Sequence, residues 1–379
     1  MEEQHSRRQQ KIFRNVTLVQ AGFLKKSRRP LPTIIGLLVT FAVMIAATWG
    51  AHAYFSLHSA LVSMNGNNGS TATSARIAAK KPISILVLGV DQGLEGRNDK
   101  GNSDTIILVT VNPTTKKATM TSIPRDTLTE ILGETSSTSY YMFKVNSAYQ
   151  FGGSSGSVKT VSAMLNVPIN YYVEVNMKAL ESLVNALGGV DVNVPFSFSY
   201  DWCDFKKGKQ HLDGRHAIAY ARMRYDDPRG DYGRQLRQRQ IIQAVVKKGL
   251  SVNGLANYQK LLKVFAKYVK TNLTFGDMTS LAINYRSAAS NISSGYIQGH
   301  DATISGTSLQ IASTEELQKW SNKLRKSLGL SPQTLTNQET RQNSLNETYN
   351  RVDFSSNETI TNYTIYEANS ITPRSSDSW

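Results

Sequence analysis

The sequence contains a single cysteine, Cys203, among 379 residues. A lone cysteine excludes an internal disulfide, so the chain is not one of the small extracellular modules that disulfides hold together. Its neighbours Trp202 and Phe205 indicate that the thiol packs among aromatic rings rather than acting as a nucleophile. The chain also lacks the ligand spacings of a zinc site, and we interpret His211 and His216 as surface or packing residues.

Charged residues are absent from positions 30–75, and residues 31–55 are almost wholly apolar. A helix of about 20 residues crosses a bilayer, whereas the apolar core of a cleaved signal peptide has about 7 to 15 residues. We therefore expect an uncleaved transmembrane anchor at residues 31–55. The preceding residues 1–30 carry eight Lys or Arg against Glu2 and Glu3. This bias predicts a single-pass protein of the cell membrane, with a cytoplasmic N-terminus and an extracellular domain after the anchor.

The formal net charge of +15 would ordinarily favour a nucleic-acid partner. Eight basic and two acidic residues lie in the tail 1–30, however, so six of these charges are explained by topology and anionic lipid. The remaining basic charge is expected outside the cell, where lipid-linked phosphates and wall polymers are the available polyanions. We therefore predict no nucleic-acid partner. An exported chain without disulfides is also more typical of a Gram-positive bacterium than of a eukaryotic ectodomain.

Composition divides the rest of the chain into three parts. Residues 56–81 are rich in Ser, Asn, Gly, Thr and Ala and predict a flexible stalk. Residues 82–330 contain strand and helix patterns and form the expected extracellular domain. In residues 331–379, Ser, Thr, Asn and Gln dominate and large apolar side chains are few, so we expect disorder.

Three strand patterns begin the expected domain. Residues 83–90 are a continuous apolar run, typical of a strand that is buried on both faces, and residues 105–111 and 117–123 form a hairpin. Helical spacing follows at 158–166 and 177–187. This mixture of strands and helices predicts an α/β fold.

Charged residues stand where these strands end. Asp91 follows the first strand, Asp104 precedes the second and Arg125 follows the third. Two carboxylates from neighbouring strand ends suit Mg²⁺, which in phosphate sites is usually held by one or two carboxylates and by substrate oxygens. Alternatively, both aspartates are turn residues that bond their own backbone. Asp126 is expected to be the ion-pair or capping partner of Arg125.

Residues 219–240 are rich in arginine. Arginine is preferred over lysine where phosphate or carboxylate is bound in a planar, bidentate manner, so the segment predicts an anionic ligand. The alternative is a solvated charged face, paired internally by Asp226, Asp227 and Asp231. The arginines are Arg222, Arg224, Arg229, Arg234, Arg237 and Arg239.

The spacing within this segment suggests a common binding spot. Arg222 and Arg224 point the same way if the chain is extended there. Arg234 and Gln238 are four residues apart and share one face of an expected helix, with Asp231 as its N-cap. The free N–H groups of that helix terminus also favour an anion.

Two other features are less specific. Lys144 either adds a point charge to the arginine site or is merely solvated. The glycine-rich residues 150–157 lack the Lys-Ser/Thr ending of a nucleotide loop, and we interpret them as an ordinary turn between helices.

Seven sequence blocks, spread over about residues 82–250, resemble in their order those of the LytR-CpsA-Psr family of cell-envelope proteins. The resemblance implies a mixed central β-sheet flanked by helices, with an apolar tunnel for a polyprenyl chain. The blocks are 85–91 (ILVLGVD), 103–106 (SDTI), 122–126 (SIPRD), 144–149 (KVNSAY), 188–191 (GGVD), 212–214 (LDG) with 219–222 (AYAR), and 224–238. Candidate tunnel residues are Met164, Leu165, Leu180 and Leu183.

The resemblance also implies an activity. The members of the LytR-CpsA-Psr family are Mg²⁺-dependent phosphotransferases. They move an anionic glycopolymer, a teichoic acid or capsular polysaccharide, from an undecaprenyl-pyrophosphate carrier to peptidoglycan. The implied substrate-binding residues are Arg125, Arg222, Arg224, Arg234, Gln238 and, as a weaker candidate, Lys144. The implied metal-associated residues are Asp91 and Asp104, which with Arg125, Arg222 and Arg224 make up the catalytic candidates. One of the two aspartates is expected to orient or deprotonate the acceptor hydroxyl.

Two other classes of protein stay open at this point. A DNA-binding regulator would suit the overall basicity, but the expected anchor would place the basic cluster outside the cell. A non-catalytic binder of polyprenyl phosphates or wall polymer would use the same arginines without turnover.

Overall fold

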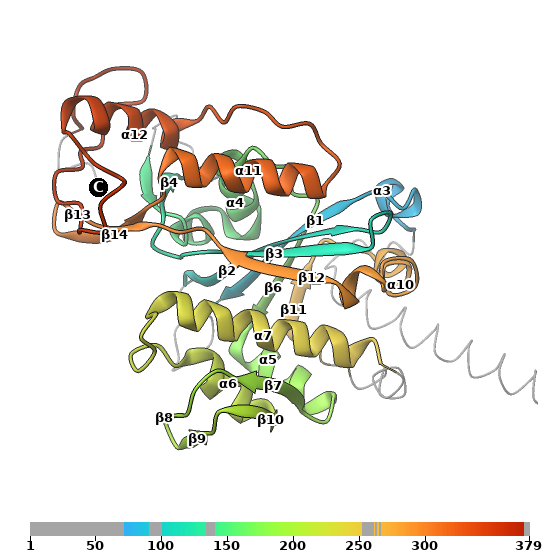
Figure 1. Ribbon diagram of the computed structural model, residues 1–379. Coiled ribbons are helices and arrows are strands. Elements are labelled where there is room, and N and C mark those ends of the chain that lie inside the picture. Colours follow the sequence, from blue (N-terminus) through green and yellow to red (C-terminus); the bar gives the residue numbers. More distant parts are fainter. Residues whose placement is uncertain are drawn as a thin grey trace, which may run out of the picture. The chain divides into compact units, whose positions relative to one another are not determined.

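A six-stranded sheet forms the centre of the computed structural model, in the order β11–β6–β1–β2–β3–β12 (Figure 1). The β1–β2 and β2–β3 pairs are antiparallel, whereas the β1–β6 and β3–β12 pairs are parallel. The predicted α/β fold with a mixed central sheet is therefore confirmed. The strands are β1 (Ile83–Val90), β2 (Ser103–Asn112), β3 (Lys117–Ile123), β6 (Tyr171–Asn176), β11 (Val269–Thr271) and β12 (Ile292–Tyr296).

The structure describes residues 72–90, 101–133, 141–251 and 267–374, together with residues 261 and 264. The predicted cytoplasmic tail and membrane anchor lie outside the described residues, as do Asp91 and most of the predicted stalk. Among the helices that are described, none has the length and apolar character needed to cross a membrane.

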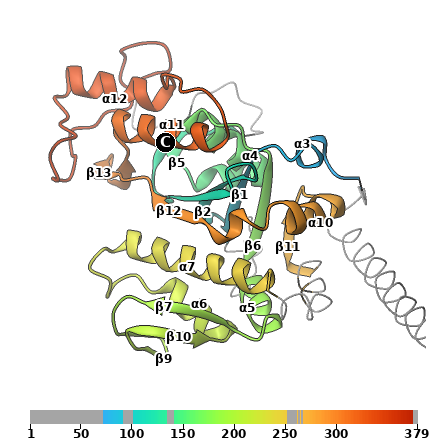
Figure 2. The same cartoon turned by 45° about the vertical axis from the view of Figure 1, so that its right-hand side comes forward.

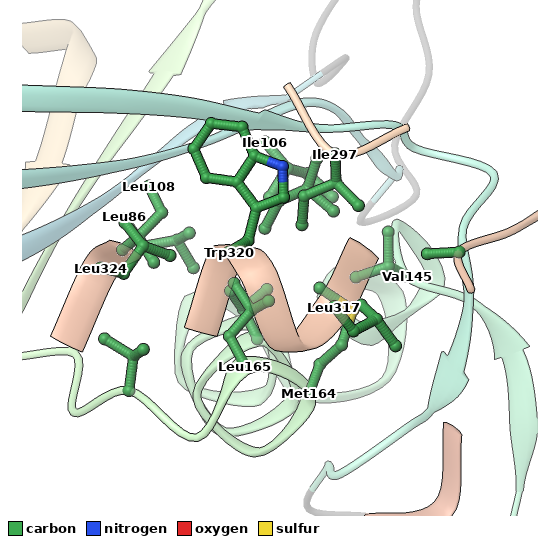
Figure 3. Close-up of a cluster of buried hydrophobic side chains, with 14 of the residues drawn as sticks. Leu86, Ile106, Leu108, Val145, Met164, Leu165, Ile297, Leu317, Trp320 and Leu324 are labelled. Atoms are coloured by element: carbon green, nitrogen blue, oxygen red, sulfur yellow. The ribbon is translucent and has the colours of Figure 1, made fainter. Parts of the chain in front are cut away.

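One face of the sheet is covered by α4 (Ser147–Leu165) and α11 (Thr314–Ser327) (Figure 1). Leu86 of β1 stands opposite Leu108 of β2, and both point toward these helices because side chains alternate between the two faces of a strand. They pack there with Met164, Leu165 and Trp320 in the largest buried cluster (Figure 3). Met164 and Leu165 are fully buried in this core, so the prediction that they line a lipid tunnel is wrong.

The opposite face of the sheet looks toward three helices and two small hairpins (Figures 1 and 2). These elements enclose a second apolar cluster that includes Cys203. Burial raises the pKa of the Cys203 thiol, which fits the predicted packing role. The elements are α5 (Met177–Ala186), α6 (Gly214–Arg222), α7 (Asp231–Gly249), β7 (Val190–Val194) with β10 (Gly208–Leu212), and β8 (Phe198–Tyr200) with β9 (Cys203–Phe205).

The end of the predicted stalk is part of the folded domain. A short helix, α3 (Ala75–Ala78), lies beside α10 (Phe275–Asn284) at one end of the sheet (Figures 1 and 2). Ile77 is fully buried, and the backbone N–H of Ser74 donates to Asp277 Oδ1 at 2.7 Å. The prediction of a flexible stalk is therefore wrong for residues 74–81, because one apolar side chain in a polar stretch is buried in the core.

The predicted disorder of residues 331–379 is wrong for the part that is described, which extends to residue 374. A helix, α12 (Gln338–Tyr349), and the chain after it pack on β4 (Leu128–Glu130) and on the hairpin of β13 (His300–Ile304) and β14 (Thr307–Ile311). The apolar residues in this stretch are few, but they share one cluster. From the tail, they are Val352, Ile360, Tyr363 and Ile365.

Buried amides complete the attachment of this C-terminal segment. Asn343 Nδ2 donates to Ala312 O at 2.9 Å, and Gln342 Nε2 donates to Tyr366 O at 2.8 Å. Because the amides of Gln342 and Asn343 find partners, a composition that is typical of disorder here forms a packed layer.

Glu339 on α12 is a buried carboxyl group. It accepts hydrogen bonds from Thr129 Oγ1 at 2.5 Å and from the backbone N–H of Glu130 at 2.9 Å. Burial raises the pKa of Glu339 above its ordinary value despite these bonds. The folded state thus favours the protonated form. The contribution of Glu339 to the free energy of unfolding is therefore fully present below the ordinary pKa of glutamate. It is lost as the pH rises through the pKa that Glu339 has in the folded state.

We predict that Glu339→Gln stabilises the domain at pH 8, because the amide resembles the protonated acid. The expected rise in Tm is about 2 to 4 °C, the change that roughly 1 kcal/mol produces in a domain of this size. At pH 4 the difference from wild type should vanish. Thermal denaturation at both pH values tests this, with the exposed Glu347→Gln on the same helix as control. A lower Tm at pH 8 would contradict the prediction.

Candidate functional site

The candidate site lies at the edge of the sheet where β1 and β3 end and β2 begins. At this edge Gly89 pairs with Thr105 and Val90 with Ser103, so Asp104 is the extra residue of a β-bulge. A bulge redirects a side chain away from the regular alternation of a strand. Gly89 permits the close approach, since a Cβ there would lie 2.8 Å from Thr105 Cβ. The bulge thereby presents the Asp104 carboxylate, whose side chain is 35% exposed, at the end of the sheet.

Arg125 lies across from this carboxylate. Its Nη1 atom is 3.1 Å from Asp104 Oδ1, and its Nε atom is 3.5 Å from Asp126 Oδ2. Lys144, the last residue of β5 (Met142–Lys144), donates to Asp126 Oδ1 at 2.8 Å. Burial alone would lower the pKa of Arg125, but the two carboxylates outweigh it and raise that pKa. The structure confirms Asp126 as a partner of Arg125 and places Lys144 in the same network.

The N-terminus of α7 contributes the second part of the site. Arg234 forms an ion pair with Asp231 through Nη2, and Arg224 Nε lies 4.0 Å from the same carboxylate. Burial, followed by repulsion from Arg125 and Arg224, lowers the pKa of Arg234. Arg234 therefore lies close to both Arg125 and Arg224, and the Asp231 carboxylate acts on all three guanidinium groups, as the predicted common spot requires.

One atom of Arg234 is of particular interest. Its Nε is buried and has no hydrogen-bond partner among the residues that the structure describes. A buried N–H without a partner costs free energy, so such a donor is expected to meet water or a ligand. A negatively charged oxygen would satisfy it best, because the neighbouring charges are guanidinium groups.

Two sequence expectations about this segment are corrected by the structure. Helix α6 continues through Arg222, so the extended chain expected at Arg222 and Arg224 is wrong; Asp213 caps the helix by accepting from His216 N at 2.9 Å. Gly230, with φ of 55°, replaces Asp231 as the N-cap of α7, because Asp231 instead binds Arg234.

Arg222 and Gln238 remain less defined than the other candidates. Arg222 is exposed at the end of α6, and it forms no ion pair with any residue in the described part of the chain. Gln238 is half-buried one helical turn after Arg234. Their participation stays a prediction.

The arginines of the segment divide into two groups that the sequence did not distinguish. Arg237 and Asp227 form an ion pair in which both side chains are fully buried, and Arg229 Nε also donates to Asp227, at 3.0 Å. Arg237 Nε in addition donates to Tyr220 O at 3.0 Å. The ion pair also requires glycine at position 233, because a Cβ on Gly233 would collide with the Asp227 side chain. The internally paired alternative is therefore correct for Arg229 and Arg237, whose role is structural.

Of the two aspartates predicted to hold Mg²⁺, Asp104 lies in the candidate site and Asp91 lies outside the described residues. Where side chains are described, no three His, Cys, Asp or Glu residues gather as a metal site. One carboxylate together with phosphate oxygens nevertheless fits Mg²⁺, which often retains water and takes few protein ligands. Of the histidines, His211 and His216 bind Asp191 and Asp213 at 2.7 and 2.8 Å on the exposed surface.

The glycine-rich segment at 150–157 holds no special place in the site. It lies within α4, which bends at Gly153 with φ of 59°. The predicted helix-to-helix turn is therefore confirmed.

The face of the sheet opposite α4 and α11 carries partly exposed apolar side chains near the site. Val87, Val109 and Val175 lie on this face and are half-buried. Core positions of a closed domain are usually covered completely, whereas this apolar row is left partly exposed. Of the remaining tunnel candidates, Leu183 is buried and Leu180 packs against the cluster beneath this face.

Comparison with known proteins agrees with the geometry. The chain matches the LytR_cpsA_psr family over residues 51–326. It is 39% identical over 306 residues to a relative from Enterococcus faecalis named polyisoprenyl-teichoic acid–peptidoglycan teichoic acid transferase TagU. The aligned stretch covers 80% of this chain and 99% of that protein. The chain therefore belongs to the LytR-CpsA-Psr family.

Solved structures share the fold. A protein from Streptococcus agalactiae is 38% identical and aligns over 70% of this chain and 93% of its own, with a TM-score of 0.64. The structure of TagT bound to LIIa-WTA is 30% identical and aligns over 66% of this chain and 92% of its own, with a TM-score of 0.56. Residues 331–374 lie beyond the stretch that matches the family.

Proposed function

We propose that this chain is a phosphotransferase that moves an anionic glycopolymer from an undecaprenyl-pyrophosphate carrier to peptidoglycan in a Gram-positive envelope. The observation that carries the proposal is the convergence of Arg125, Arg224 and Arg234 on one spot, with a buried guanidinium N–H that lacks a partner in the described chain. The name of the Enterococcus faecalis relative favours teichoic acid over capsular polysaccharide as the polymer.

The charges of the site suit this chemistry. Transfer breaks a P–O bond of the pyrophosphate, and negative charge grows on the leaving and equatorial oxygens. Arg125, Arg224 and Arg234 are held in advance by Asp104 and Asp231, so they stabilise that charge with little reorganisation. Arg222 and Gln238 would complete the pyrophosphate contacts, and Lys144 would add a charge.

Asp104 and Asp91 are proposed to act on the acceptor side. Either carboxylate would orient or deprotonate the sugar hydroxyl that attacks phosphorus. The same two residues would hold Mg²⁺, which when bound would neutralise charge on the phosphate oxygens. The half-buried apolar row of Val87, Val109 and Val175 would receive the first isoprene units of the carrier.

We predict that Arg224→Ala or Arg234→Ala lowers the transfer rate at least tenfold, because one charge-assisted hydrogen bond contributes about 1.5 to 3 kcal/mol. The assay uses purified full-length protein, a lipid-pyrophosphate-linked teichoic acid and a peptidoglycan acceptor. Arg215→Ala is the matched control, since this exposed arginine stacks 4.4 Å above the Trp202 ring, apart from the site. Equal losses in all three variants would indicate a diffuse basic surface. Binding of the lipid substrate by wild type without turnover would favour the non-catalytic binder.

The metal proposal has its own test. Asp91→Asn and Asp104→Asn should each lower turnover sharply and raise the Mg²⁺ concentration needed for half-maximal activity, because each removes a charge that holds the cation. If both aspartates are only turn residues, asparagine makes the same local bonds. Activity is measured against Mg²⁺ concentration for wild type and both variants. Superimposable curves would eliminate the metal site.

The proposed location also follows from the sequence. We expect residues 56–379 outside the cell and attached to the membrane through residues 31–55. Protease added to intact cells whose wall has been removed should therefore digest the domain. Recovery of the protein intact, as a soluble cytoplasmic species, would contradict both the location and the proposed function.

A further inference from the structure

Arg239 is a buried guanidinium without a counter-ion in the described chain. Its side chain lies between α7 and the sheet, and the residue is 3% exposed. Nη1 donates to Ser122 Oγ at 2.5 Å, and the guanidinium lies 5.9 Å from the centre of the Tyr296 ring. Its Nε is buried and unpartnered, and no described carboxylate forms an ion pair with it.

Arg237, two residues earlier on the same helix, shows how this fold satisfies a buried arginine that has a structural role. It binds the Asp227 carboxylate and also the backbone carbonyls of Tyr220 and Met223. Charge and hydrogen bonds are both matched there. Arg239 has one hydroxyl and one ring instead, so its surroundings are those of a binding group rather than a structural one.

The charge on Arg239 persists at neutral pH. Burial lowers its pKa to about 10, which is still well above physiological pH. An isolated charge in a protein interior is strongly unfavourable, and it is retained where another charge arrives to compensate it. An anionic group is therefore the expected partner.

The position of Arg239 indicates which anion this is. Ser122 stands opposite Ile107 on β2, on the same face of the sheet as the half-buried apolar row. Gln235, one helical turn before Arg239, has a buried and unpartnered Oε1, and its Nε2 donates to Asp231 Oδ2 at 2.7 Å. Asp231, Gln235 and Arg239 follow one another at intervals of four residues, so they lie along one face of α7. An anion attached to an apolar chain matches both surroundings.

We propose that Arg239 binds the lipid-side phosphate of the polyprenyl-pyrophosphate substrate. The assignment rests on the proposed function and adds a residue to that site. In the transfer, the acceptor hydroxyl gives its proton to the carboxylate of Asp91 or Asp104, and its oxygen forms a bond to the sugar-linked phosphorus. The bond from that phosphorus to the bridging oxygen breaks, and its electron pair remains on the polyprenyl phosphate. This leaving group gains one negative charge, which the Arg239 guanidinium neutralises.

The first test is thermal stability of the full-length protein without ligand. Arg239→Met removes an uncompensated charge and keeps most of the side-chain volume, so its Tm should equal or exceed that of wild type. Arg237→Met, which leaves the buried Asp227 carboxylate with only the exposed Arg229 as its charged partner, should lower Tm or prevent folding. A clear loss of Tm in Arg239→Met would show that the chain itself supplies a counter-ion, and the proposal would fail.

The second test is binding of farnesyl phosphate, farnesol and inorganic phosphate to wild type and Arg239→Met. Farnesyl phosphate should bind the variant at least tenfold more weakly, while farnesol binds both equally. Parallel losses for both farnesyl ligands, or no loss at all, would overturn the assignment. Inorganic phosphate that binds wild type as tightly as farnesyl phosphate would identify a site for free phosphate instead.

Turnover separates this proposal from the function on which it rests. If wild type transfers teichoic acid and Arg239→Met transfers it equally fast, the role of Arg239 fails alone. If wild type transfers nothing but loses farnesyl phosphate affinity on the Arg239→Met change, the proposed function fails and the phosphate site stands. A drop of at least tenfold in kcat/KM for the variant supports both.

Discussion

The buried ion pair between Asp227 and Arg237 determines how the arginine-rich segment is presented. Arg237 on α7 binds the carbonyl of Tyr220 in α6 and the carboxylate of Asp227 in the loop between the helices. The end of α6, the loop and the start of α7 therefore form one rigid unit. Breaking a buried pair costs about 3 to 5 kcal/mol because the remaining charge is stranded. Arg224 and Arg234 owe their positions on either side of this loop to that constraint.

Compensation of charge distinguishes the parts of the site. Arg125 is matched by Asp104 and Asp126, and Arg224 and Arg234 share Asp231. These groups are held in place before a ligand binds. Because Arg224 and Arg234 share the single Asp231 carboxylate, the site keeps a net positive charge there. Such an arrangement favours an anion with several charges.

The C-terminal segment supports the site from behind. Residues 331–374 lie beyond the family match, yet Glu339 binds Thr129, only four residues after Arg125. Next to it, the backbone N–H of Gln310 on β14 donates to Asp126 O at 2.9 Å. Contacts from a residue beyond the family match and from β14 thus hold the segment that follows Arg125. An extension of polar composition stabilises the loop that carries a candidate catalytic arginine.

The sequence by itself determined the α/β class, the central strands and the candidate residues that the structure brings together, Asp104, Arg125, Arg224 and Arg234, because apolar periodicity and local motifs are properties of neighbouring positions. Only the tertiary structure decided which arginines are structural, since the partner of Arg237 depends on how a loop folds back on its helix. It also decided that Met164 belongs to the core and that the tail is ordered. A few apolar side chains and amides of the tail are buried against strands that are distant in sequence. The average composition of the tail does not show which of its residues meet such partners.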